Sequence, residues 1–123
     1  MKNEVNNARF EAIRGFSLPR YKHLPSVGLY LEQTTKYINY CLKPLGCAEI
    51  TNSMIRNYVK MGLVHNPVKK QYSREQIALL TMIVALKQTA SMEDIRSMLS
   101  TENGLTVEEM YTLFCNGQQK VIQ

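Results

Sequence analysis

Apolar residues recur every three to four positions along most of the chain, which is the period of an amphipathic helix. The longest apolar run, IALLTMIVAL at 77–86, follows a capping box formed by Ser73 and Gln76. It predicts a central helix that continues to about residue 88, because its apolar positions cover most of the helix circumference. N-cap residues predict the starts of three further helices at Thr51, Ser91 and Thr106. No stretch of useful length alternates as a strand does, so the pattern predicts an all-α domain.

Helical spacing also predicts which side chains face the core. The inner faces contain Leu31, Thr35, Ile38, Leu42 and Leu45 before a stop signal at Gly46; Ile95, Met98 and Leu99; and Val107, Met110, Leu113 and Phe114. Met82, Met92 and Met98 are expected to fill the core. Residues 1–28 form an arm before the main domain at 29–105, and Phe10, Ile13, Phe16 and Leu18 are expected to dock on the core. A C-terminal helix follows over 106–123.

The helix that begins after Thr51 has two different faces. Its apolar side contains Met54, Ile55, Tyr58 and Val59, and its polar side contains Ser53, Arg56, Asn57 and Lys60. We expect this helix to end near Gly62. The next segment, VHNPVKKQY at 64–72, contains a turn signal at Asn66–Pro67 and suits a small wing or a bent loop.

Charge is distributed unevenly along the chain, although the formal net charge is only +5. Between Thr51 and Lys87 one acid, Glu75, accompanies six basic residues: Arg56, Lys60, Lys69, Lys70, Arg74 and Lys87. Residues 91–123 have two basic and five acidic residues. A basic middle beside an acidic tail is typical of a protein with one face for a polyanion, although two ordinary solvated faces would give the same counts.

The residues exclude several classes of function. There is no Gly-rich phosphate loop, no carboxylate pair in an apolar setting and no nucleophile with an evident base, so we expect no enzyme activity. Three cysteines and two histidines lack the spacing of metal ligands. We therefore expect no metal, no cofactor and no small-molecule ligand, and reduced thiols in a cytoplasmic protein. The longest apolar run is about half a membrane span, which argues against a membrane protein.

Nucleic-acid binding is the chemistry that the residues favour. An α-helix fits the major groove of DNA, where its polar side chains reach base edges while flanking cations bind phosphate. The candidate DNA-binding residues are Asn52, Ser53, Arg56, Asn57, Lys60, Lys69, Lys70 and Tyr72. Tyr72 is expected to pack on the core with its hydroxyl near phosphate. RNA is the weaker candidate, because the chain lacks an aromatic stacking platform.

The order of these residues resembles the DNA-binding half of MerR-type regulators. The matching positions are Ile55-Arg56-Asn57-Tyr58, Gly62-Leu63, Pro67, Tyr72-Ser73, and Ser91-Met92-Glu93-Asp94-Ile95. The upstream stretch LPRYKHLPSVGLYLEQTTKYINY resembles a narrower group of uncharacterised, mainly Gram-positive bacterial proteins that are described only as a domain of unknown function. This second resemblance extends from about Leu18 to Phe114.

The resemblance to MerR-type regulators implies a winged helix-turn-helix with a short, reduced wing and a C-terminal amphipathic helix. It implies a regulator of transcription that binds double-stranded DNA as a homodimer joined through the C-terminal helix. The wing HNPVKKQY lacks the Gly-Tyr-Arg sequence usual in the family, and Ser53 stands where many members have a long charged residue. The alternative hypothesis is therefore a protein-interaction module that keeps the scaffold without binding DNA.

Overall fold

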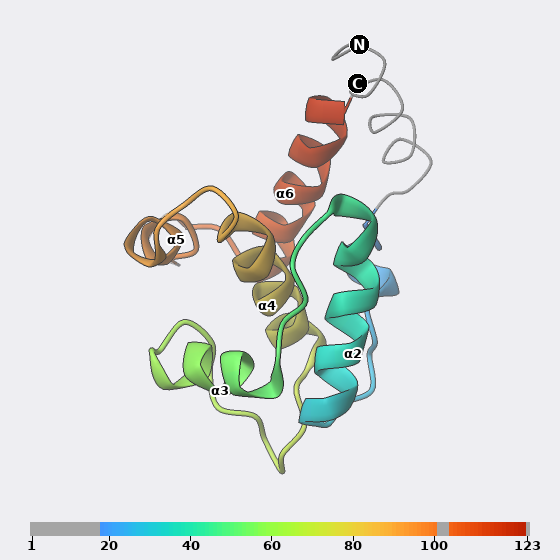
Figure 1. Cartoon of the computed structure of the whole chain (residues 1–123), viewed down its shortest axis with the longest axis vertical. Coiled ribbons are helices and arrows are strands. Elements are labelled where there is room, and N and C mark those ends of the chain that lie inside the picture. Colours follow the sequence, from blue (N-terminus) through green and yellow to red (C-terminus); the bar gives the residue numbers. More distant parts are fainter. Residues whose placement is uncertain (1–17, 101–103, 123) are drawn as a thin grey trace.

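The computed structural model describes residues 18–100 and 104–122, and these form a group of helices (Figure 1). In chain order the elements are the 3₁₀ turn η1 (Tyr21–His23), α2 (Leu31–Leu42), the 3₁₀ turn η2 (Lys43–Leu45), α3 (Asn52–Lys60), α4 (Arg74–Leu86), α5 (Met92–Met98) and α6 (Val107–Ile122). The described residues contain no strand, only two isolated β-bridges. The all-α prediction is confirmed.

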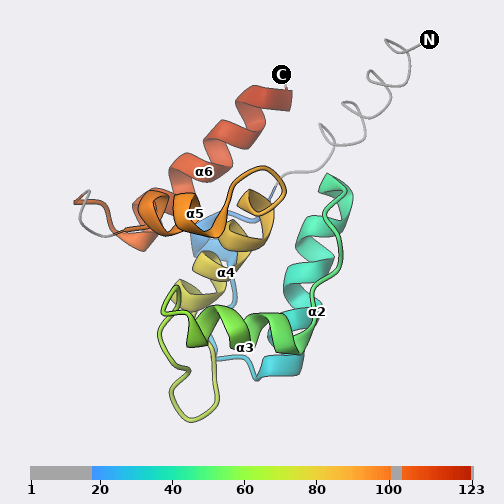
Figure 2. The ribbon, with the colours of Figure 1, turned by 60° about the vertical axis from the view of Figure 1, so that its left-hand side comes forward.

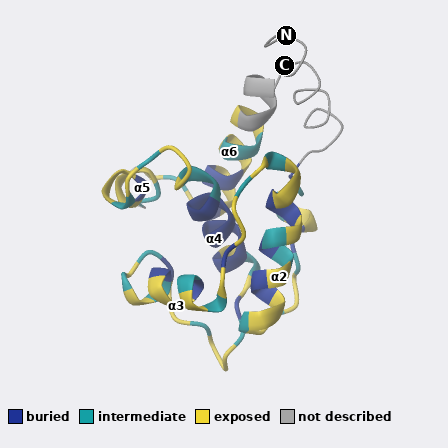
Figure 3. Ribbon diagram, viewed as in Figure 1, coloured by how far each residue is buried: buried dark blue, intermediate teal, exposed yellow. Residues whose placement is uncertain are grey.

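Helix α4 is the centre of the core. Every residue from 76 to 84 is buried, as Figure 3 shows, and α2 and α6 pack against this helix. The same core includes Leu18 and Leu24 from the arm and Tyr111 from α6. The predicted docking of Leu18 is therefore confirmed, whereas Phe10, Ile13 and Phe16 lie outside the described residues. No described helix combines the length and apolar character that crossing a bilayer requires.

The predicted helix starts are confirmed by hydrogen bonds at each cap. Thr51 Oγ1 accepts from the backbone N–H of Met54 at 3.2 Å, and Ser91 Oγ accepts from Asp94 at 3.1 Å. Reciprocal capping boxes join Ser73 to Gln76 and Thr106 to Glu109. The helix ends differ from prediction by one or two residues, since α3 ends at Lys60 and α4 at Leu86. Gly62 has a φ of +81°, which turns the chain away after α3.

Two residues predicted to face the core do not. Met98 is 49% exposed and Leu113 is 58% exposed. Around the axis of α5, Met98 and Leu99 lie on either side of Ile95. The core contact is centred on the buried Ile95, and Met98 lies at the edge of that contact. In α6 the inner face is centred on Val107 and Tyr111, with Tyr111 fully buried where Leu113 was expected.

Candidate nucleic-acid interface

Helix α3 is held by its apolar side and presents its polar side outward. Ile55 and Tyr58 are buried, and Met54 and Val59 are half-buried. The polar residues of the other side are exposed: Ser53, Arg56, Asn57 and Lys60. The predicted two-faced helix is confirmed. Figure 2 shows α3 at the edge of the group of helices, with the connection to α4 looping below it.

A minimal hairpin follows α3 and presents two lysines at its tip. The Gln71 N–H donates to the Val68 carbonyl at 2.9 Å, and the Val68 N–H donates to the Gln71 carbonyl at 3.2 Å. The central residues Lys69 and Lys70 have φ values of 52° and 66°. Positive φ at both central positions is the property of a type I′ turn, which normally takes Asn-Gly. The predicted position of the turn, at Asn66–Pro67, is wrong. The turn lies at Lys69–Lys70, because the two hydrogen bonds between Val68 and Gln71 close it there.

The side chain of Gln76 anchors the loop that leads into this hairpin. Its Nε2 donates to the carbonyls of His65 at 2.8 Å and Asn66 at 3.0 Å, while its Oε1 accepts from the Ser73 N–H at 2.7 Å. The residue is buried. The sequence shows Gln76 as a capping residue only. Its second role is to anchor the loop, and the sequence indicates this role only through the choice of glutamine. A glutamate here could cap the helix but could not donate hydrogen bonds to the loop carbonyls.

The hairpin is also joined to the start of α2. Leu29 and Tyr72 exchange two backbone hydrogen bonds, at 3.0 Å from Leu29 N–H and 2.7 Å from Tyr72 N–H. Gly28 lies so close to Gln71 that a Cβ atom there would fall 2.8 Å from the Gln71 Cβ. This close approach brings the N-terminal end of α2 beside the lysine-tipped turn.

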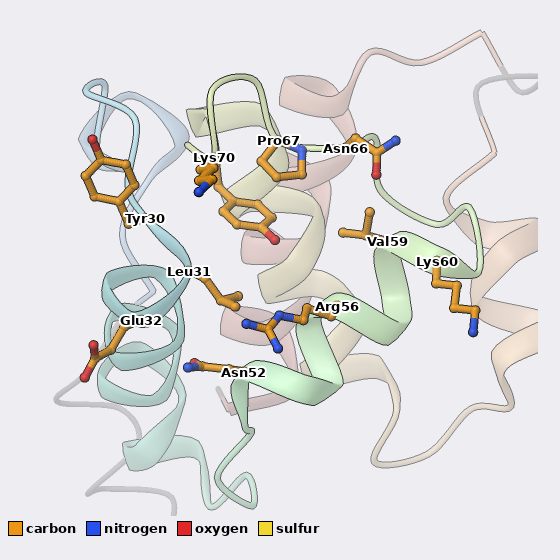
Figure 4. Close-up of a pocket in the computed structure, with 11 residues that line it drawn as sticks. Tyr30, Leu31, Glu32, Asn52, Arg56, Val59, Lys60, Asn66, Pro67 and Lys70 are labelled. Atoms are coloured by element: carbon orange, nitrogen blue, oxygen red, sulfur yellow. The ribbon is translucent and has the colours of Figure 1, made fainter.

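These three elements enclose a groove of about 780 Å³ between the start of α2, one side of α3 and the hairpin (Figure 4). It brings together five of the predicted site residues: Asn52, Arg56, Lys60, Lys70 and Tyr72. Apolar side chains from Leu31, Val59 and Pro67 also line it. Ser53, Asn57 and Lys69 do not line the groove. They are exposed on the outer side of α3 and at the turn.

Some of the predicted residues already have partners within the protein. The Thr35 hydroxyl donates to Asn52 Oδ1 at 2.6 Å, which holds that amide at the end of the groove. Asn57 Nδ2 donates to Met61 Sδ at 3.5 Å.

Tyr72 is only 4% exposed. Burial raises the pKa of Tyr72 above its ordinary value, and the nearby Arg56 guanidinium opposes part of that rise. The Tyr72 hydroxyl therefore stays protonated near neutral pH.

Two of the six basic side chains between Thr51 and Lys87 contact other groups of the protein. Arg74 Nε donates to the Leu24 carbonyl at 3.1 Å, and its guanidinium lies 5.8 Å from the ring centre of Tyr21. The Lys87 amine lies 5.3 Å from the ring centre of Tyr58. Lys87 is exposed but lies at the C-terminal end of α4. The exposed cations on α3 and the turn are Arg56, Lys60, Lys69 and Lys70.

Two residues outside the predicted set also belong to this region. Arg96 of α5 donates from Nη2 to the Met61 carbonyl at 2.7 Å, and so caps the C-terminal end of α3. Tyr30, 53% exposed, lines the groove at the start of α2. Arg96 carries no sequence signal, since its partner lies 35 positions away. Nowhere in the described ranges do three His, Cys, Asp or Glu side chains gather in a way that could hold a metal ion.

The comparison with protein families agrees with the narrower of the two resemblances seen in the sequence. The family model described as Domain of unknown function (DUF1836) matches residues 19–114, from Pro19 to the middle of α6. No curated protein and no solved structure matches the chain. Because the family model covers most of the 123 residues, the chain belongs to the DUF1836 family.

Proposed function

We propose that this protein is a sequence-specific DNA-binding regulator of transcription, built as a winged helix-turn-helix of the MerR type. The observation that carries the proposal is the groove between α3 and the lysine-tipped turn, which gathers Arg56, Lys60 and Lys70 along one opening. Their spacing on two separate elements suits a phosphate strand that runs between a helix and a wing.

The positions of the predicted residues divide them into two roles. In this proposal α3 enters the major groove, and its outermost exposed side chains, Ser53 and Asn57, reach base edges. The cations that line the groove bind the sugar–phosphate backbone and set the depth and angle of the helix. Arg56 is placed to contact either base edges or phosphate, because it is exposed on α3 and also lines the groove.

The backbone conformation of the hairpin turn supports a phosphate contact by Lys70, the lysine of the turn that lines the groove. A non-glycine residue at positive φ is strained by about 1 kcal/mol or more, and Lys69 and Lys70 are both in that region. Strain of this kind is common at binding sites, where the side chain matters more than the backbone preference. A lysine at the tip of a short wing supplies the charge that a phosphate contact requires.

The protein acts in this proposal as a homodimer. Three groove cations per chain predict a slope of about −3 in a plot of log affinity against log salt, and two chains double it. The apolar groove of about 260 Å³ between α4, α5 and α6 supports a dimer contact, because the exposed Met98 and Leu113 both line it. Sedimentation of wild type, Leu113→Glu and the control Asn116→Glu tests this contact. A wild-type protein that stays monomeric at high concentration would exclude it.

Salt-dependent binding to duplex DNA tests the main proposal. Fragments selected from random DNA are titrated with wild type, Arg56→Ala and Lys43→Ala, an exposed lysine at the far end of α2 that serves as the charge-matched control. We expect Arg56→Ala to weaken binding at least tenfold and to reduce the slope by about 0.9, and Lys43→Ala to match wild type. Equal binding by wild type and Arg56→Ala would refute the proposal.

The second candidate function is a protein-interaction module that retains this scaffold. The apolar groove with Met98 and Leu113 favours it, because exposed apolar patches mark contact surfaces. The two functions differ in the variant that should weaken binding, which is Arg56→Ala for DNA binding and Leu113→Glu for the interaction module. A partner that binds wild type and Arg56→Ala equally, but loses Leu113→Glu, would favour the interaction module.

A further inference from the structure

Tyr30 occupies a position where an aromatic side chain is unexpected. It is the N-cap of α2, and the preferred N-cap residues are Ser, Thr, Asp and Asn, whose side chains accept a hydrogen bond from the first turn. The Tyr30 side chain makes no such bond. The helix therefore lacks a stabilising interaction at this residue, and Tyr30 is 53% exposed.

The backbone that carries this ring is held firmly. The Tyr30 N–H donates to Gln33 Oε1 at 2.9 Å, and the Tyr30 carbonyl accepts from the N–H of Thr34 at 2.8 Å and its hydroxyl at 2.9 Å. The preceding residue, Leu29, is paired in both directions with Tyr72. An exposed aromatic side chain on a fixed backbone loses little conformational freedom when it binds a partner, which favours its use as a contact residue.

The ring stands at one end of the basic groove. Figure 4 shows Tyr30 at the α2 end and Lys60 at the opposite end, with Arg56 between them. The Tyr30 hydroxyl has no hydrogen-bond partner among the described residues, so its donor is available. The groove combines three cations with an apolar lining that includes Leu31, Val59 and Pro67. One acidic residue, Glu32, also lines it, and its carboxylate is paired with Lys36 at 3.4 Å. A sugar–phosphate strand presents both kinds of partner for this lining, namely anionic phosphates and largely apolar sugar faces.

We propose that Tyr30 is a DNA-contact residue, whose ring covers a deoxyribose and whose hydroxyl donates to a phosphate oxygen of one strand seated in this groove. The inference rests on the proposed function, because it places a DNA strand in the groove. It adds the start of α2 as a third contact element beside α3 and the turn. Because the contact is to the backbone, it acts on any DNA sequence and positions the protein rather than selecting bases.

The test uses two variants of Tyr30 with opposite effects on helix capping. Tyr30→Ser removes the ring and restores a preferred N-cap, so we expect the melting temperature to stay equal or rise while affinity for a random-sequence duplex falls about tenfold. Tyr30→Phe removes only the hydroxyl, and we expect a loss of several-fold with the salt slope unchanged, because a neutral donor displaces no counterion. Tyr40→Ser is the matched control, since Tyr40 is a 76% exposed tyrosine on the same helix that does not line the groove.

The outcomes separate this inference from the proposed function. If wild type binds the duplex, Arg56→Ala loses binding and both Tyr30 variants bind like wild type, the inference is wrong while the proposed function stands. If Tyr30→Ser lowers melting temperature and affinity together and Tyr30→Phe binds like wild type, Tyr30 is structural only and the inference is also wrong. If wild type binds no duplex at any salt concentration, both fail.

Discussion

Replacing the two lysines of the hairpin turn one at a time should separate backbone strain from DNA contact. Lys69 and Lys70 both have positive φ, but only Lys70 lines the groove beside Arg56. Lys69→Asn and Lys70→Gly introduce the residues that a type I′ turn prefers. Glycine at position 70 removes about 1–2 kcal/mol of backbone strain from the folded state. It also destabilises the fold by about 0.5–1 kcal/mol, because glycine gives the unfolded chain more conformational freedom. The net gain is about 0.5–1 kcal/mol, and Lys69→Asn should gain slightly less.

These gains predict a rise in melting temperature of about 2–8 °C for each variant, because 1 kcal/mol corresponds to roughly 4–8 °C in a domain of this size. DNA binding should change in only one of them. Each phosphate contact contributes about 0.9 to the salt slope, which at physiological salt is a factor of roughly five in affinity. We therefore expect Lys70→Gly to bind about fivefold more weakly and Lys69→Asn to match wild type.

Thermal unfolding followed by circular dichroism, and duplex titration at several salt concentrations, measure the two effects independently. A lower melting temperature for Lys70→Gly would refute the assignment of strain at the turn. An unchanged salt slope for Lys70→Gly would refute the phosphate contact. A reduced slope for Lys69→Asn would mean that DNA also binds outside the groove, across the tip of the turn.

Further predictions concern the residues that support the interface. Gln76→Glu retains the capping oxygen but loses both donors to the loop carbonyls, so urea unfolding should show a loss of about 3 kcal/mol, and a loss below about 1 kcal/mol would contradict the anchoring role. Tyr58→Phe should leave stability equal or raise it by up to about 1 kcal/mol, since the buried hydroxyl has no partner among the described residues; a clear loss would show that it is bonded. Arg74→Ala should lower stability by about 1 kcal/mol and leave the salt slope unchanged, and a reduced slope would place Arg74 on DNA instead. Burial raises the pKa of Tyr111 and of the Cys115 thiol, so the unfolded chain releases these protons first and the free energy of unfolding should fall as pH rises above about 8.5; a constant value up to about pH 10 would contradict this.

The local elements of this fold could be predicted because their determinants are local. A helix cap needs only the residue at the start and the one three positions later, as at Ser73 and Gln76. The two faces of α3 follow from helical spacing alone, and the burial of Ile55 and Tyr58 agrees with it. The periodicity was less informative for α5 and α6, because it indicates an apolar arc but not the direction from which the core approaches. Met98 and Leu113 were assigned to the wrong side of that boundary.

The candidate site could be predicted in part. The sequence placed Arg56 and Lys60 on the exposed side of one helix, and it placed Lys70 in the loop that follows. It could not show that Lys70 shares a groove with Arg56 while Lys69 does not, because that depends on the turn closing at Val68–Gln71. Charge counting also overestimated the basic surface, since the partner of Arg74 is a carbonyl 50 positions away.

The sequence by itself determined where the α-helices of the described part of the chain begin and which side of α3 is apolar, because capping and amphipathic spacing act over a few residues. Only the tertiary structure decided which polar side chains remain available to a partner. Pairing of Leu29 with Tyr72, anchoring of the loop by Gln76 and the bond from Arg74 to Leu24 all join segments distant in sequence. Such contacts form when the apolar faces pack, and no short-range pattern records them. The groove, and Tyr30 at its rim, exist only because those packed faces bring α2, α3 and the turn together.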